Sequence, residues 1–182
     1  MKIIDNALNK EQFNELTNVM LGPQFPWHYT DAVVAEKAFD TEKYQIQFVH
    51  QLHENMGPTT DMDTFNLMWR FFELLQPLQL IRIKANLLPV ADKIIEHGYH
   101  VDTIVPGALT AIFYLNSNNG ETRFEGHCDV VESKANRLVI FPATWKHTGT
   151  TCTDSKTRCV INFNYIPYPG KDFKLLELEE KL

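Results

Sequence analysis

Two segments of the chain alternate between apolar and polar side chains, interrupted only at Val160. Residues 81–87 read IRIKANL and residues 158–165 read RCVINFNY. Successive side chains of a β-strand point to opposite faces, so each segment predicts a strand with one apolar and one polar face. The polar faces would carry Arg82, Lys84, Asn86, Arg158 and Asn162. Polar groups turned into a small barrel or jelly roll cost stability unless they bind something, so the pattern predicts an interior binding site.

Helical spacing is found before residue 77. The first predicted helix runs from Leu8 to Gly22, and Gly22–Pro23 ends it. A second is expected from about Asp63 to Gln76, and Pro77 stops it. Their apolar stripes consist of Phe13, Leu16, Val19 and Met20 in the first helix and of Phe65, Met68, Trp69, Phe72 and Leu75 in the second. Both stripes are typical of helices that pack against a sheet.

Further strands are expected in the second half of the chain. Leu109–Leu115 is rich in β-forming residues and is followed by NSNNG and then ETRFEG. Turn residues between two such runs predict a tight hairpin. Arg137–Phe141 is a further strand, and Pro142 ends it.

Size and composition fit one globular unit of 182 residues, with a formal net charge of −6. We expect no nucleic-acid partner, because phosphate contacts need clustered Lys and Arg. Cys128, Cys152 and Cys159 show no CxxC spacing, which favours free thiols in a reducing compartment. No long apolar stretch opens the chain, so we expect no signal peptide and no membrane span, and a cytoplasmic location.

A candidate metal site begins at His100-Val101-Asp102. On an extended strand, residues two apart point to the same side, so an imidazole and a carboxylate can converge on one ion. His147 would complete a set of two histidines and one carboxylate, which leaves positions open on Fe(II). His127-Cys128-Asp129 has the same spacing, but only one strand fits between it and His147, so we do not expect it to bind the metal. His97 is expected at the surface or behind the ligands.

Arg158 follows His147 by eleven residues and opens a strand on its polar face. A guanidinium matches a carboxylate with two parallel hydrogen bonds and stays charged. Arg158 is therefore suited to hold the far carboxylate of a small diacid.

This ordered set resembles the 2-oxoglutarate/Fe(II) oxygenase superfamily, in the branch near the prolyl hydroxylases. The resemblance covers roughly Leu80 to Pro167. It implies an α+β, mainly β fold, a double-stranded β-helix or jelly roll with supporting N-terminal helices. It also implies a single domain over residues 1–182, with helical support over about 1–77 and the jelly-roll core over about 78–167.

The resemblance implies roles for the matching residues. His100, Asp102 and His147 would bind Fe(II), and Arg158 would anchor 2-oxoglutarate. Tyr114 is similar in placement to family tyrosines whose hydroxyl contacts the co-substrate, although a buried sheet tyrosine is an equal alternative. Lys84 and Asn86 lie on a strand that also contributes to that pocket in relatives. Collagen-type prolyl hydroxylases usually anchor 2-oxoglutarate with a lysine, so Arg158 argues against assuming a prolyl substrate.

The implied reaction oxidises a small-molecule or peptide substrate, usually by hydroxylation, and releases succinate and carbon dioxide, with ascorbate as a possible supporting reductant. Two alternatives stay open. One is a cupin-like iron dioxygenase that does not use 2-oxoglutarate. The other is a non-catalytic jelly-roll binding module.

The choice between the two HxD motifs can be tested directly. His100→Ala and Asp102→Ala should each abolish stoichiometric Fe(II) binding without unfolding the protein, because each removes one of three ligands. His127→Ala should leave binding unchanged. Metal titration, with circular dichroism as the folding control, measures both; the reverse pattern would assign the metal to the second motif.

Overall fold

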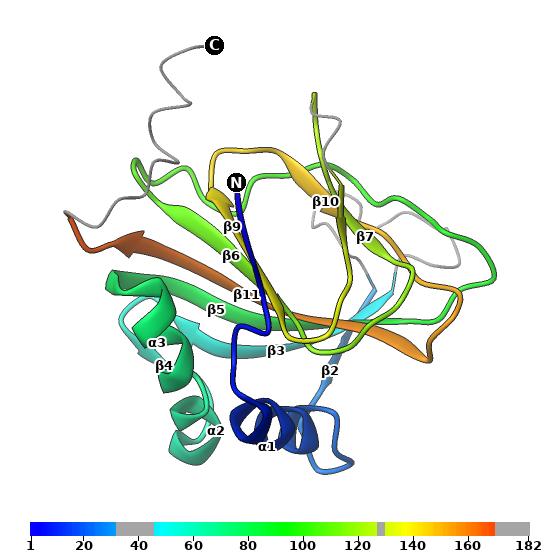
Figure 1. Cartoon of the computed structure of the whole chain (residues 1–182), viewed down its shortest axis with the longest axis horizontal. Coiled ribbons are helices and arrows are strands. Elements are labelled where there is room, and N and C mark those ends of the chain that lie inside the picture. The colour runs from blue at the N-terminus through cyan, green and yellow to red at the C-terminus, as the bar shows by residue number, and fades with distance from the viewer. Residues whose placement is uncertain (32–45, 127–129, 170–182) are drawn as a thin grey trace.

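Two antiparallel sheets face each other, and three helices cover the outer face of the larger one (Figure 1). The computed structural model describes residues 1–31, 46–126 and 130–169. The large sheet has the order β1-β9-β6-β11-β5-β3-β2, with β4 paired to β3, and the small sheet has the order β10-β7-β8. The predicted fold class, mainly β with supporting helices, is confirmed.

The strands are β1 (Lys2–Asp5), β2 (His28–Thr30), β3 (Gln47–Glu54), β4 (Gly57–Pro58), β5 (Pro77–Pro89), β6 (Leu109–Tyr114), β7 (Glu121–Phe124), β8 (Val130–Glu132), β9 (Arg137–Pro142), β10 (His147–Gly149) and β11 (Thr157–Pro167). The helices are α1 (Lys10–Met20), α2 (Met62–Asn66) and α3 (Trp69–Leu75). Four of these strands lie within the first 77 residues, a stretch expected to be helical support. The single-domain organisation stays a prediction.

The two alternating segments lie side by side as β5 and β11. Their apolar faces pack into the main core beneath the helices, as predicted, through Ile83, Ala85, Cys159, Ile161, Phe163 and Tyr165. One register shift was not predicted. Asn164 pairs with Arg82 but Tyr165 pairs with Leu80, so Ile81 is left out of the register and Leu80 packs against the core instead.

α1 begins at a capping box in which Asn9 and Gln12 exchange hydrogen bonds between side chain and backbone. Leu16 and Met20 are buried, as predicted. Val19 was predicted wrongly, because its side chain is 39% exposed.

The second predicted helix is two short helices, α2 and α3. At the junction Leu67 donates to the carbonyl of Thr64, and Met68 to that of Phe65, so both bonds reach back three residues. Such a turn holds about 3.0 residues instead of 3.6, which rotates the buried face of α3 relative to that of α2. Phe65, Met68 and Leu75 are buried, as predicted. Trp69 was predicted wrongly, because it is 60% exposed, and Phe71, which was not part of the predicted stripe, is buried.

The predicted hairpin at NSNNG is also wrong. β6 pairs with β9 and β11, whereas β7 pairs with β8 and β10, so this connection crosses from one sheet to the other. In this connection, asparagine side chains accept hydrogen bonds from backbone amides, which in a hairpin would pair with the neighbouring strand. The Asn116 Oδ1 accepts from the Cys159 amide at 3.0 Å, and the Asn118 Oδ1 accepts from the Gly120 amide at 2.9 Å.

A second core cluster lies between the sheets and contains Ile112, Tyr114, Phe124, Val131, Val139, Phe141 and Val160.

The described helices include none that is both long and apolar enough to cross a bilayer.

The helix break predicts unequal effects of two aromatic truncations. Phe71 is fully buried, with its ring centroid 4.8 Å from those of Phe113 and Phe163, so Phe71→Ala should destabilise the protein by about 3–5 kcal/mol. Trp69→Ala, the matched control, should cost about 0.5 kcal/mol or less because Trp69 is exposed. Urea unfolding measures both. A larger cost for Trp69→Ala would favour one continuous helix.

Candidate metal centre

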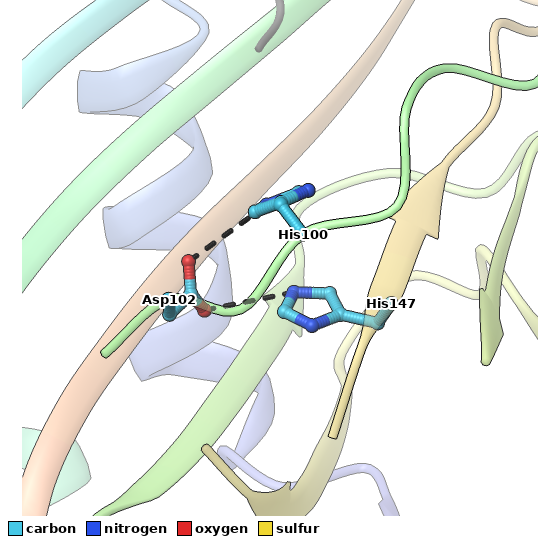
Figure 2. A group of neighbouring side chains, drawn as sticks. All are labelled: His100, Asp102 and His147. Carbon is cyan, nitrogen blue, oxygen red and sulfur yellow. Dashed lines mark ion pairs between the residues drawn. The ribbon is translucent and has the colours of Figure 1, made fainter. Parts of the chain in front are cut away.

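His100, Asp102 and His147 come together between the two sheets (Figure 2). One ligand atom from each lies within 4.8 Å of the others. The Asp102 carboxylate lies between the two imidazoles, with Oδ2 3.6 Å from Nε2 of His147 and Oδ1 3.9 Å from Nε2 of His100. The three residues predicted from spacing alone therefore meet at one point.

The prediction that His100 and Asp102 share a strand is wrong. His100 forms only an isolated bridge with His147, and Asp102 lies in the loop after it. The backbone amides of His100 and His147 each donate to the other residue's carbonyl at 3.0 Å. This reciprocal pair holds the two histidines side by side, with ring centroids 4.8 Å apart.

Backbone carbonyls determine which imidazole nitrogen is free to bind a metal. Nδ1 of His100 lies 3.2 Å from the carbonyl of Gly98, and Nδ1 of His147 lies 3.1 Å from that of Trp145. A carbonyl only accepts hydrogen bonds, so each Nδ1 carries the proton and each Nε2 keeps its lone pair. The Nε2 of His147 is buried and has no hydrogen-bond partner in the described chain. A buried lone pair of this kind fits a metal ligand.

Asp102 is held by three side chains that spacing did not reveal. Nη2 of Arg82 donates to Oδ1 at 2.8 Å, while Oδ2 accepts from Nδ2 of Asn164 at 3.1 Å and from the Thr110 hydroxyl at 3.2 Å. Arg82 in turn donates through Nε to Asn164 at 3.0 Å. Arg82 and Asn164 are partners in the β5–β11 register, which could not be read from either strand alone.

These contacts determine the charge of the site. Burial by itself would raise the pKa of Asp102, but His147, Arg82 and Asn164 together bring that pKa below its ordinary value. Burial lowers the pKa of His147, so its imidazole is neutral at pH 7. Two imidazoles and one carboxylate form a donor set that fits Fe(II).

Arg158 is a buried cation, 4% exposed, and no carboxylate lies within 4 Å of it in the described chain. Nε donates to the Ser133 hydroxyl at 2.9 Å, and Nη2 donates to the Thr122 hydroxyl at 2.9 Å. Desolvation lowers the pKa of this guanidinium. A buried charge satisfied only by neutral groups favours the binding of an anion.

Two glycines make room for the Arg158 side chain. A Cβ on Gly149 would lie 3.0 Å from Nη1, and a Cβ on Gly120 would lie 2.7 Å from Cδ. Gly149 is two residues from His147 on β10, so the guanidinium lies on the histidine side of the cavity.

Tyr114, predicted to contact a co-substrate, does not line the cavity. Its hydroxyl donates to Oγ1 of Thr122 at 2.7 Å, and the Arg158 guanidinium lies 5.7 Å from its ring centroid. Thr122 therefore accepts from both Tyr114 and Arg158, which leaves its own proton to donate into the cavity. Thr122 was not predicted, although it alternates inward with Phe124 on β7.

The ligands and Arg158 line one cavity of about 320 Å³. Lys84 and Asn86 line it too, as predicted, but the Asn86 amide makes only a 3.5 Å contact, with the Lys84 carbonyl. His127 and Asp129 lie outside the described residues. His97 is buried, so a position at the surface is excluded.

Solved structures that share this fold include 2-oxoglutarate-dependent enzymes. A 2OG-Fe(II) oxygenase family oxidoreductase from Burkholderia pseudomallei matches with a TM-score of 0.62 and 13% identity, over 92% of this chain and 85% of that one. The α-ketoglutarate-dependent epimerase SnoN from nogalamycin biosynthesis matches with a TM-score of 0.66 and 13% identity, over 91% and 77%.

A prolyl hydroxylase from Trichoplax adhaerens, solved with a hypoxia-inducible-factor peptide, matches with a TM-score of 0.60 and 12% identity, over 91% of this chain and 83% of that one. The chain has the 2-oxoglutarate/Fe(II) oxygenase fold. The predicted resemblance to this superfamily is therefore confirmed at the level of the fold. No protein-family profile and no curated protein sequence matches the chain.

The close approach of Gly149 to Arg158 predicts a specific defect. Gly149→Ala should displace the guanidinium and weaken 2-oxoglutarate binding by about three- to tenfold, because small misplacements of an anchoring group are costly. Metal affinity should not change. Gly57→Ala is the matched control, since a Cβ there meets nothing within 4 Å. Calorimetry measures both affinities, and equal co-substrate binding by the two variants would contradict the assigned role of Gly149.

Proposed function

We propose that this protein is a 2-oxoglutarate- and Fe(II)-dependent dioxygenase that hydroxylates a small-molecule or peptide substrate and releases succinate and carbon dioxide. The observation that carries the proposal is the pairing of two incomplete sites in one cavity. One is a His-Asp-His donor set whose buried His147 Nε2 has no hydrogen-bond partner, and the other is a buried guanidinium with no carboxylate within 4 Å, both among the described residues.

Each residue has a defined task in this proposal. His100, Asp102 and His147 hold Fe(II), and the carbonyls of Gly98 and Trp145 keep both imidazoles in the ligating tautomer. Arg82, Asn164 and Thr110 orient the Asp102 carboxylate.

The co-substrate residues line the same cavity. Arg158 binds the distal carboxylate of 2-oxoglutarate, and Thr122 can donate its free proton to the same group. Tyr114 positions Arg158 and Thr122, and Asn86 lines the same cavity. When bound, the iron and 2-oxoglutarate supply the oxidising chemistry, and the protein supplies geometry, charge and exclusion of water.

The matching solved structures favour this reaction class without naming the substrate. SnoN is an epimerase and the Trichoplax enzyme a prolyl hydroxylase, so the same fold serves more than one outcome. A cytoplasmic location is part of the proposal, supported by Cys152 and Cys159, which are free thiols.

Turnover without the true substrate tests the proposal. Purified protein given Fe(II), oxygen, ascorbate and 2-oxoglutarate should slowly form succinate, because the chemistry resides on the metal and co-substrate. Zinc in place of iron should stop the reaction, since zinc has no redox chemistry. His147→Ala should abolish it.

Arg158→Ala provides a second readout. It should weaken 2-oxoglutarate binding by about 2–5 kcal/mol, and Arg158→Lys should recover only part, because the planar fork is lost. Failure of the wild-type protein to bind either Fe(II) or 2-oxoglutarate would refute the proposal and favour a non-catalytic module. Oxygen consumption with iron alone would favour a cupin-like dioxygenase.

A further inference from the structure

Four pairs of register partners follow one another along the polar faces of β5 and β11, and every member except Asn164 lines the cavity. At one end, Arg82 and Asn164 are register partners, and both bind Asp102. At the other end, Arg158 faces Leu88 and reaches toward Gly149. Between them, Lys84 and Asn162 are register partners, and both line the cavity.

This middle pair lacks the partners that its neighbours have. In the part of the chain that the structure describes, no hydrogen bond or ion pair reaches the Lys84 ammonium. The Oδ1 of Asn162 is buried and likewise has no hydrogen-bond partner there. Desolvation, and then the charge of Arg82, lower the pKa of Lys84, which measures how poorly its charge is compensated. Polar groups left in this state are normally satisfied by a ligand.

The charge of the cavity points to the kind of ligand. Among the described residues that line it, Arg82, Lys84 and Arg158 are cationic and Asp102 is the one acid. The lining therefore has an excess of two positive charges. Fe(II) adds two positive charges and 2-oxoglutarate adds two negative charges, so loading both leaves the excess unchanged.

The co-substrate cannot supply the missing anion at Lys84. In the proposed function, one carboxylate of 2-oxoglutarate would lie at the metal, where the charge of Fe(II) compensates it, and the other at Arg158. Lys84 lies four residues along β5 from Leu88, the register partner of Arg158, which is about 13 Å of strand. A third carboxylate must therefore come from another molecule.

We propose that the Lys84 ammonium, together with the Nδ2 donor of Asn162, binds a carboxylate of the primary substrate, and that this substrate is a small carboxylic acid. The inference rests on the proposed function and adds the substrate class. It assigns Lys84 to the substrate instead of to the co-substrate pocket, which the sequence resemblance had implied. Val101, Leu88, Ile112 and Val160 provide apolar walls for the hydrocarbon part of such an acid. The cavity of about 320 Å³ must also hold 2-oxoglutarate, which favours a small molecule over a bulky one.

Binding can be measured without turnover on protein loaded with zinc and 2-oxoglutarate. The probes are the straight-chain monocarboxylates from acetate to hexanoate, each paired with its uncharged amide. Glutamate blocked at both backbone ends represents an acidic side chain of a peptide. Ligand-observed NMR titration should show that at least one free acid binds while its amide does not.

The Lys84 variants decide the assignment. Lys84→Met should weaken binding of that acid by about tenfold or more, whereas Lys84→Arg should retain most of it. Both should bind zinc and 2-oxoglutarate as the wild type does. Lys93→Met, at an exposed lysine outside the cavity, should behave as the wild type in every titration.

The contrary results are distinct. If no acid binds better than its amide, or if Lys84→Met weakens 2-oxoglutarate as much as the acid, the substrate assignment is overturned. Binding of the blocked glutamate alone would overturn the small-acid assignment in favour of a peptide. Failure of the wild type to bind 2-oxoglutarate would instead refute the proposed function, and the inference with it.

Discussion

A residue in a β-strand can face only one side of its sheet, and β5 and β11 apply this constraint at the centre of the molecule. One face of each strand packs against α1, α2 and α3, where Ile83, Ala85 and Phe163 are buried. The helices exclude water from that side, so the polar side chains have to face the small sheet. The cavity between the sheets follows from the same alternation that forms the core.

Within that cavity, the buried charges of Asp102 and Arg158 differ in how the surrounding protein compensates them. Asp102 is surrounded by donors from three strands, and one of them, Arg82, carries a full positive charge. In the described part of the chain, Arg158 donates hydrogen bonds only to hydroxyl groups, and it lies over an aromatic ring. The protein thus compensates its carboxylate internally and leaves its guanidinium to be compensated from outside, which fits the proposed roles of Asp102 as a metal ligand and of Arg158 as an anchor for an anion.

Local patterns in the sequence predicted the features that depend on neighbouring residues. Alternation placed Arg158 and Lys84 on interior faces, and the two-residue spacing identified His100 and Asp102, although these two do not share a strand. A backbone bridge joins His100 to His147 instead. The missed features depend on contacts between distant segments. Arg82 reaches Asn164 across 82 positions of chain, and Gly149 is needed because Arg158 passes over it. The shortened turn at Leu67 and the crossing at NSNNG likewise depend on packing and sheet partners, which no single segment encodes.

The ion pair between Arg82 and Asp102 has a consequence for the life of the polypeptide before it acquires a metal. In many small metal-binding domains the ligands repel or stay solvated without the ion, so folding waits for it. Here the carboxylate already has a cation and two neutral donors, and the bridge between His100 and His147 is made of backbone alone. We therefore expect the newly made chain to fold completely in iron-starved cells. The metal would then bind afterwards, to a site that is already formed.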